Sequence, residues 1–587
     1  MQVTSNGRRG VGLVIVIFWL ITLFLSGTSY ALERQPVAED VVTEELLPPN
    51  PIIEYETILN LAQFDGGRDI TVDEAGNAYV VARAYDNNND VLIVKLDQGG
   101  NELWHTFLGG SNHDFGFGIE INAVGDIYVA GWTLSSDFPI LNAWQTTLNG
   151  GADGFITKLS GQDGSLIFST YFGGSRAEYA YDLALDVAGN IYITGYTDST
   201  DLPTMNPIQP DLNLMYCFCD DAFVAEFDGD GAALLYGTYL GGALDDRGYE
   251  IDVDGQGNIS FAGTTASPDW PLANALQTVY GGNQDAFVAQ LGGDGSVLNY
   301  STYLGGSEEE FVKDIVVNDS GAFVMGRTNS GDYLTTPGAF QEQYSGGGCG
   351  TPPVTYPCHD VFVTKLLPDG TADFSTYIGG TKDDIGGEIA LDSNGRIYIV
   401  GFTGSSDFPL ANHSGGYIFV TELNETGSQL NYTVPIDSPV ANDGHSIALD
   451  GTDAIYITGA QNVPADLYVA KLVDDKMPIA TLRSVDISFN YEWRDGSYLV
   501  NGIVAVVDEQ DAPVTGAMVH VTWTIPNGQT KEQIVMTDVN GTALFTAEGR
   551  SGAYTLHVDN ILMTNYTFDW ENSVLESSIA INNLRRK

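Results

Sequence analysis

The sequence lacks the features on which helical proteins and polyanion-binding proteins depend. Outside the N-terminus, no long apolar stretch follows the 3.6-residue spacing of a helix. Lysine and arginine together number only 23, against 77 aspartates and glutamates, and the formal net charge is −54. A surface of that charge repels phosphate backbones and anionic lipid headgroups. We therefore expect no nucleic-acid partner, and no membrane contact beyond the N-terminal segment.

Motifs for nucleophilic or zinc chemistry are missing as well. The chain has no Gly-x-Ser-x-Gly nucleophile motif, and its seven histidines show no paired ligand spacing. We therefore expect no enzymatic activity and no cofactor, apart from calcium, which is considered below.

The N-terminus has the pattern of an export signal. Arg8-Arg9 precedes an apolar run from Val11 to Leu25, and Ser29 and Ala31 then supply small residues at positions −3 and −1 of a cleavage site. This pattern predicts cleavage of a signal peptide between Ala31 and Leu32. The alternative is an uncleaved anchor, because residues 10–32 could nearly span a bilayer. Both place the rest of the chain outside the cytoplasm, in the medium or at the cell surface.

Glycine is abundant, at 69 residues, and it marks a repeat. Each unit combines a Tyr-Leu-Gly-Gly strand, two strands around an Asp-x-x-Gly-Asn turn, a Ser-x-Asp-Phe-Pro loop and an Asp-Ala-Phe-Val strand. Four short apolar strands per unit are typical of a propeller blade. The turn recurs seven times, which predicts an all-β, seven-bladed β-propeller; its copies centre on Gly76, Gly125, Gly189, Gly257, Gly321, Gly395 and Asp453.

The turns and the ring closure follow from the same repeat. The turn aspartate is expected to accept backbone N–H groups, and Gly189 or Gly395 to take the positive φ that other residues avoid. One Tyr-x-Gly-Gly strand is missing from the series, and Glu54 to Asn60 fits its place. We therefore predict that this N-terminal strand completes the last blade.

These motifs resemble the bacterial SBBP-type beta-propeller repeat family over about residues 55–475. The resemblance rests on the loop pattern around Asp137, Asp201, Asp269 and Asp407, on Asn-Ala-x-Gln at 142–145 and 274–277, on Asp-Ala-Phe-Val at Asp221 and Asp285, and on Tyr-Leu-Gly-Gly at Tyr239 and Tyr303. It implies a secreted or surface propeller, and it leaves the ligand open.

A second domain follows the repeat. The patterns around Pro513 to Trp523 and Thr537 to Ala543 resemble bacterial Ig-like and carboxypeptidase-regulatory-like sandwiches, with Trp523 in the core. The expected domains are a signal peptide or anchor (1–31), a linker (32–53), the propeller (54–475), a linker (476–482) and a small Ig-like β-sandwich (483–587).

Two kinds of candidate site stand out. Asp252, Asp254 and Asn258 place oxygen donors as calcium loops do, although the EF-hand spacing is missing and plain β-turns are the favoured explanation. In an exported chain the four cysteines suggest disulfides, and we favour Cys349–Cys358. Cys217 and Cys219 could remain thiols, because a bond between them would be strained.

The cysteines lie in two long loops at equivalent places in different blades, which predicts one functional face. Loop aromatics suited to glycan or protein contact are Tyr216, Phe218, Tyr344 and Tyr356. We expect an exported or cell-surface interaction scaffold that binds a glycan or a protein there. The alternative is a secreted polysaccharide-active enzyme with its site in the central channel. Non-repeated acids or histidines in that channel would favour the enzyme, and repeated residues the scaffold.

Overall fold

The computed structural model describes residues 51–581 except 62–64, 87, 214–218, 352–353, 412–415, 437–442, 461–465, 475–479, 495–496, 508–511, 516, 563–565 and 569–572. These residues form strands and no helix, so none of them forms a helix that could cross a membrane. The predicted signal or anchor, with Ala31 and Leu32, lies outside the described residues.

The repeat region consists of four-stranded antiparallel sheets whose strands follow one another along the chain. One sheet holds β6 (Asp114–Ile121), β7 (Asp126–Thr133), β8 (Asp153–Ser160) and β9 (Leu166–Phe172). The next holds β10 (Glu178–Leu185), β11 (Ile191–Thr197), β12 (Asp221–Phe227) and β13 (Leu234–Leu240). It is followed by β14 (Asp246–Val253), β15 (Ile259–Thr265), β16 (Asp285–Leu291) and β17 (Leu298–Leu304).

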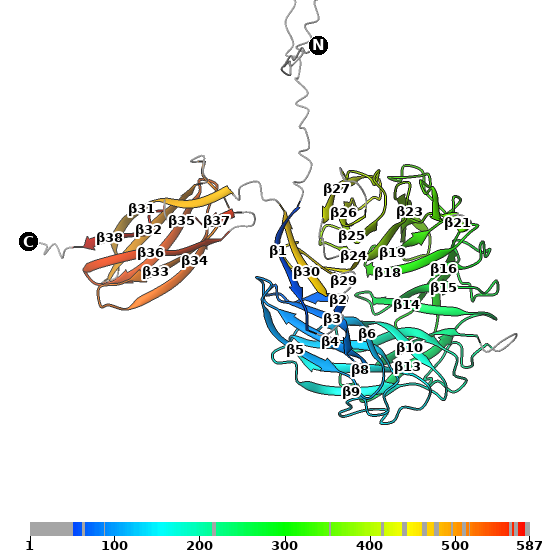
Figure 1. Cartoon of the computed structure of the whole chain (residues 1–587). Helices are drawn as coiled ribbons and strands as arrows, with labels where there is room; N and C mark the ends of the chain where they lie inside the picture. The colour runs from blue at the N-terminus through cyan, green and yellow to red at the C-terminus, as the bar shows by residue number, and fades with distance from the viewer. Residues whose placement is uncertain are drawn as a thin grey trace, which may run out of the picture. The chain divides into compact units, whose positions relative to one another are not determined.

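Two further sheets continue the series. The first holds β18 (Glu310–Asn318), β19 (Gly321–Thr328), β22 (Asp360–Leu366) and β23 (Ala372–Ile378), and the hairpin β20 (Gly348–Thr351) and β21 (Val354–Pro357) is inserted in it. The second holds β24 (Asp384–Leu391), β25 (Ile397–Thr403), β26 (Tyr417–Leu423) and β27 (Leu430–Ile436). The sheets surround a common centre, as in a β-propeller (Figure 1).

The chain ends of the repeat region meet in an eight-stranded sheet. One half is β28 (Asp443–Leu449), β29 (Ile455–Ala460), β30 (Leu467–Asp474) and β1 (Pro51–Leu59). The other half is β2 (Asp65–Val72), β3 (Ala78–Asp86), β4 (Asn88–Leu96) and β5 (Glu102–Leu108). A single pair, Gly66 with Ala460, joins the halves. Strand β1 runs antiparallel to β30 over its whole length, so the N-terminal strand completes the last sheet, as predicted.

Both faces of each sheet are buried against neighbouring sheets. On β11, Ile191 and Ile193 pack with residues of β7 and β8, whereas Tyr192 packs with residues of β15 and β16. All three are almost completely buried. Apolar residues at successive positions of a strand are therefore required here, which is why the strands lack the alternation of a half-exposed sheet.

The turns between the first two strands of each sheet have the predicted chemistry. In the turn after β10, Asp186 accepts the N–H groups of Ala188 and Asn190, and Gly189 has a φ of 86°. Asp453 takes the same place in the last sheet with a φ of 62°, a conformation that aspartate tolerates better than most residues.

The C-terminal region is a pair of four-stranded sheets around one core. One sheet contains β35 (Thr542–Gly549), β32 (Ser497–Val507), β31 (Ala480–Arg494) and β37 (Tyr566–Phe568). The other contains β34 (Thr530–Met536), β33 (Met518–Thr524), β36 (Gly552–Leu562) and β38 (Glu576–Ile581). Trp523 is fully buried in the shared core, and its Nε1–H donates to Gln533 (2.9 Å). The first strand begins three residues before the expected boundary at 483.

Candidate ligand-binding channel

The Ser-x-Asp loop of the repeat holds a buried carboxylate at the start of the innermost strand. In the β14 sheet, Asp246 accepts the hydroxyl of Thr265, the hydroxyl of Ser267 (2.8 Å) and the N–H of Gly242 (2.5 Å). Burial raises the pKa of Asp246 to about 7. The same network recurs in other sheets, so these acids join loop to strand; we call Asp114, Glu178, Asp246, Glu310 and Asp384 the strand-start carboxylates.

Past this position each innermost strand has a β-bulge. The pairing with the next strand shifts by one residue, for example between Gly248 and Glu250 on β14. A bulge turns two successive side chains toward the same side of a strand. The bulged residues are Arg68, Phe117, Tyr181, Tyr249, Lys313, Gly387 and His445.

The bulged segments surround a cavity of about 580 Å³. Its lining comes from β2, β6, β10, β14, β18, β24 and β28, the innermost strand of each set of four, so the cavity is the central channel of the propeller. Seven acids line it, and we call them the channel carboxylates: Asp69, Glu120, Asp182, Glu250, Asp252, Asp314 and Glu388.

The channel carboxylates lie close together, and all are half-buried except Asp314, which is buried. Burial raises the pKa of Asp69 and Asp252 to about 6 and that of Glu120 and Asp314 to about 8. Most of them also raise one another's pKa, because a negative charge disfavours ionisation of its neighbour. The pKa of Glu250 is raised well above its usual range, first by burial and then by Asp182, Asp314 and Asp69, with Lys313 opposing the shift.

Most of these acids join neighbouring sheets. The backbone N–H of Ile119 donates to Asp69 (2.7 Å), that of Ile251 to Asp182 (2.9 Å) and that of Ile389 to Asp314 (2.7 Å). Each of these three carboxylates also accepts the N–H of its own following residue. Glu388 similarly accepts the N–H of Ile447, and Asp252 that of Val317. Such carboxylates are structural, since they satisfy buried backbone donors.

Glu250 is different. It occupies the same place after the bulge as Asp182 and Asp314, but it accepts no hydrogen bond from any residue that the structure describes. Asp252, two residues later, makes the link to the next sheet instead. The Glu250 carboxylate is therefore left facing the channel.

Aromatic side chains cover the channel on four consecutive sheets. Around the cavity, the ring of Tyr181 lies 4.7 Å from Phe117 and 5.3 Å from Tyr249, and Tyr249 lies 5.0 Å from Phe311. Further rings extend this contact along β6, β7, β10 and β11. We call the whole set the aromatic arc: Phe115, Phe117, Trp132, Tyr179, Tyr181, Tyr196, Tyr249 and Phe311. All of them are partly exposed.

The three predicted calcium residues do not form one group, because Asp254 and Asn258 contact each other and Asp252 lies apart from them. The Asp254 carboxylate accepts N–H groups of Gln256 and Asn258 and the side-chain amide of Asn258 within its turn. Asp252 instead faces the channel from β14. The three residues thus perform two separate structural tasks, a turn and a link between sheets.

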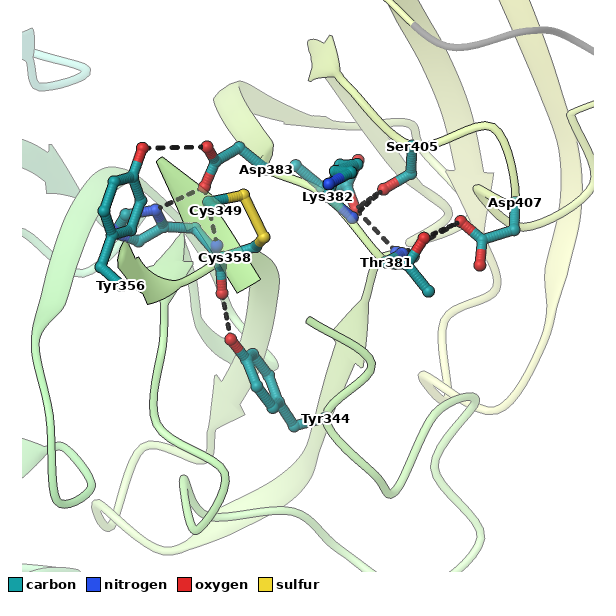
Figure 2. The surroundings of a disulfide bond; sticks show 12 residues. Tyr344, Cys349, Tyr356, Cys358, Thr381, Lys382, Asp383, Ser405 and Asp407 are labelled. Carbon is teal, nitrogen blue, oxygen red and sulfur yellow. Dashed lines mark hydrogen bonds and ion pairs between the residues drawn. A yellow bond between two sulfur atoms is a disulfide. The ribbon is translucent and has the colours of Figure 1, made fainter. Parts of the chain in front are cut away.

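The predicted disulfide loop forms a small stapled hairpin. Cys349 and Cys358 are bonded, with Cα atoms 5.0 Å apart, across β20 and β21 (Figure 2). Beside it, Asp383 accepts the backbone N–H of His359 (3.0 Å) and the hydroxyl of Tyr356 (3.4 Å). Because both sulfur atoms are in the disulfide, neither is free as a thiolate ligand for a metal ion.

The predicted loop face is only partly described. Tyr216, Phe218 and Cys217 lie outside the described residues, and Cys219 is disulfide-bonded, so it is not a thiol. The Tyr344 hydroxyl donates to the carbonyl of Cys358 (Figure 2), and its ring packs against Tyr377. Tyr356 is 42% exposed. Of the two loop aromatics that the structure describes, Tyr344 and Tyr356, Tyr356 is therefore the more accessible.

Sequence reasoning missed the channel, although a signal for it exists. An acid followed by isoleucine or leucine recurs before the turn of five repeats, as in Asp182-Leu183 and Glu250-Ile251. The bulged residue stands just before that acid. It is aromatic at Tyr181 and Tyr249, and in the repeat before them Phe117 takes the same place, followed by Gly118 instead of an acid.

The comparisons with known proteins bear on the repeat. Residues 167–203 and 373–409 match the family model described as SBBP, beta-propeller repeat. The chain carries propeller repeats of this type. Each matched segment runs from the outermost strand of one sheet through the first two strands of the next and ends after the Ser-x-Asp loop. The repeat in sequence is thus offset by one strand from the sheet in space.

More distant likenesses exist. The regulatory protein FlaEY of Caulobacter vibrioides is 23% identical over 356 residues, which are 58% of this chain and 35% of that protein. The chain thus matches about a third of that relative's length. The Pan2 WD40 domain of Neurospora crassa (TM-score 0.36, 9% identity, 69% of this chain and 88% of that one) is similar in structure. So is the quinohemoprotein alcohol dehydrogenase of Comamonas testosteroni (0.39, 10%, 75% and 79%). Likenesses this weak support no functional conclusion.

Proposed function

We propose that this protein is an exported or cell-surface scaffold, without enzymatic activity, that binds a glycan at the channel of a seven-bladed propeller. The observation that carries the proposal is the aromatic arc beside the channel carboxylates. Partly exposed rings offer apolar faces for the C–H groups of a sugar, and carboxylate oxygens accept hydrogen bonds from its hydroxyl groups. A cavity of about 580 Å³ is within the usual size of a ligand site.

The arrangement of the sheets supports a count of seven blades. Among the described strands, seven sets of four are arranged in chain order, if the eight-stranded sheet is divided at its single Gly66–Ala460 pair. The innermost strand of each set contributes to the channel. The two sheets after residue 480 fit the Ig-like module expected from the sequence, which would serve as a spacer or a second adhesion unit.

The repeated acids favour a scaffold over an enzyme. Asp69, Asp182 and Asp314 stand at equivalent places and are each occupied by two backbone N–H groups. Carboxylates that accept two backbone N–H groups join neighbouring sheets of the propeller. General acid–base catalysis instead needs carboxyl groups that are free to exchange protons.

A polysaccharide-active enzyme is the second candidate, because Glu250 departs from this pattern. A catalytic acid is a carboxyl group whose pKa its surroundings raise, and burial and neighbouring acids raise that of Glu250. Release of shortened chains from a bound polysaccharide, lost on Glu250→Gln, would support this reading against the scaffold.

The test is retention of the purified protein on a panel of immobilised polysaccharides, with product release followed in parallel. We expect retention without release, and at least a tenfold loss of retention in Tyr249→Ala. Trp493→Ala is the matched control, because Trp493 is 60% exposed, belongs to β31 and is not among the residues that line the channel. Equal retention of both variants would refute the channel as the site. Repeating the panel with calcium and with a chelator tests calcium as a cofactor.

A further inference from the structure

The channel lining contains more acidic side chains than basic ones. Its lining includes seven carboxylates, whereas Arg68 and Lys313 are the lysine and arginine side chains among the described lining residues, and His445 adds a titratable ring. Charges inside a protein interact more strongly than charges in water. A ligand that brings positive charge into this cavity would therefore be favoured over a neutral one, and an anionic ligand would be repelled.

One of these acids, Glu250, differs from its neighbours in its hydrogen bonds. The carboxylates of Asp182, Asp314 and Asp252 accept backbone N–H groups and have part of their charge stabilised in place. Glu250 lies among them without such a donor, and Lys313 is the cation that lowers its pKa. Its oxygens are the ones available to accept hydrogen bonds from a ligand.

The rings next to Glu250 are suited to a cation as well. Tyr181 and Tyr249 stand perpendicular to one another with their centres 5.3 Å apart, and Phe311 stacks on Tyr249. The faces of such rings attract ammonium and guanidinium groups. The protein's own cations already use the arc in this way, since Arg247 lies 4.9 Å above Tyr196 and Arg327 lies 5.3 Å above Phe311.

We propose that the bound glycan carries free, protonated amino groups, as in a chain of glucosamine units, and that Glu250 accepts the ammonium between Tyr181 and Tyr249. This inference rests on the proposed function. The arc extends over four sheets, from Phe115 to Phe311, which suits an extended chain of sugar rings better than a single amine. Lys313 and Arg68 would then face the sugar hydroxyl groups rather than its amines.

The test compares three soluble hexasaccharides by titration calorimetry at pH 6 and low salt: a glucosamine hexamer, its fully N-acetylated form and a galacturonic acid hexamer. We expect the glucosamine hexamer to bind at least tenfold more tightly than the N-acetylated form, and the acidic hexamer not to bind. Glu250→Gln should abolish this preference and leave the affinity for the N-acetylated form within about twofold. The matched control is Glu309→Gln, which alters an exposed acid of a loop.

The outcomes separate the two proposals. Equal binding of the glucosamine and N-acetylated hexamers would overturn the amine inference while supporting glycan binding. A preference that survives in Glu250→Gln would overturn the role of Glu250. If no hexamer binds and hexalysine does, the ligand is a basic peptide and the proposed function itself is wrong. Thermal unfolding of each variant must match that of the unaltered protein within a few degrees for these comparisons to count.

Discussion

The strand-start carboxylates and the channel carboxylates lie on the same strands, a few residues apart, and have opposite surroundings. Asp246, at the start of β14, accepts three hydrogen bonds from its own loops. Glu250, four residues later, accepts none from the described residues and faces other acids. Asp246 is fully buried and Glu250 is half-buried, and burial raises the pKa of both. The comparison shows that the number of available donors, rather than burial, separates an acid that stabilises the fold from one that is free for a ligand.

A change of pH acts on both sets at once and should have the largest effect. Burial raises the pKa of Glu178 and Glu310 to about 7, and that of Asp314 to about 8, above the values near 4 of an unfolded chain. Such groups bind protons more tightly in the folded state, so the free energy of unfolding rises as pH falls through about 8 toward 5. We expect the melting temperature to be several degrees higher at pH 5 than at pH 8.

Below about pH 4 the trend should reverse. Hydrogen bonds from backbone N–H groups lower the pKa of Asp137, Asp201 and Asp407, and the stability that these loop aspartates contribute is lost when they are protonated. Melting curves recorded at half-unit steps of pH test both the rise in stability from pH 8 to pH 5 and the fall below pH 4. A melting temperature that is flat between pH 8 and pH 5 would mean that the buried acids are hydrated in solution.

Removal of one strand-start carboxylate should be the most damaging single substitution. Asp246→Ala leaves the hydroxyl groups of Thr265 and Ser267 and the N–H of Gly242 without their acceptor. Each buried donor left unsatisfied costs about 1–3 kcal/mol, so we expect a loss of about 3 kcal/mol or more in the free energy of unfolding in urea. Asp230→Ala, at an exposed turn residue, is the control. A loss below about 1 kcal/mol would show that the network is not structural.

Substitution of a channel carboxylate that joins two sheets should cost less. Asp182→Asn keeps the shape but offers one oxygen where two N–H groups, from Leu183 and Ile251, are bound. We expect a loss of about 1–2 kcal/mol, because the relief of charge repulsion offsets part of the lost hydrogen bond. Hydrogen exchange at the Ile251 amide is the specific measurement. If its protection does not fall, the link between β10 and β14 does not stabilise the ring.

The strands and turns could be predicted from the sequence, whereas the channel could not. The reason is that turns depend on neighbouring residues and the channel depends on a bulge in each innermost strand. A turn depends on the residues next to it in sequence, so Asp186 and Gly189 predict their turn even when the rest of the fold is unknown. The channel depends on a bulge that shifts the register of the strand pairing by one residue. After the bulge, side chains that would have pointed to one face of the strand point to the other. Asp252 shows the consequence, because its spacing from Asp254 suggests a shared metal, whereas the two side chains serve different surroundings.

Glu250→Gln should have the smallest effect and the opposite sign. At pH 8 the ionised form of Glu250 is disfavoured by burial and by Asp182 and Asp314, so removing its charge should stabilise the fold. At pH 5 the carboxyl group is protonated and resembles the amide, and the gain should vanish. Urea unfolding at both pH values measures the difference. Destabilisation at pH 8 would mean that Glu250 is bound within the fold, as Asp246 is, and is not free to receive a ligand.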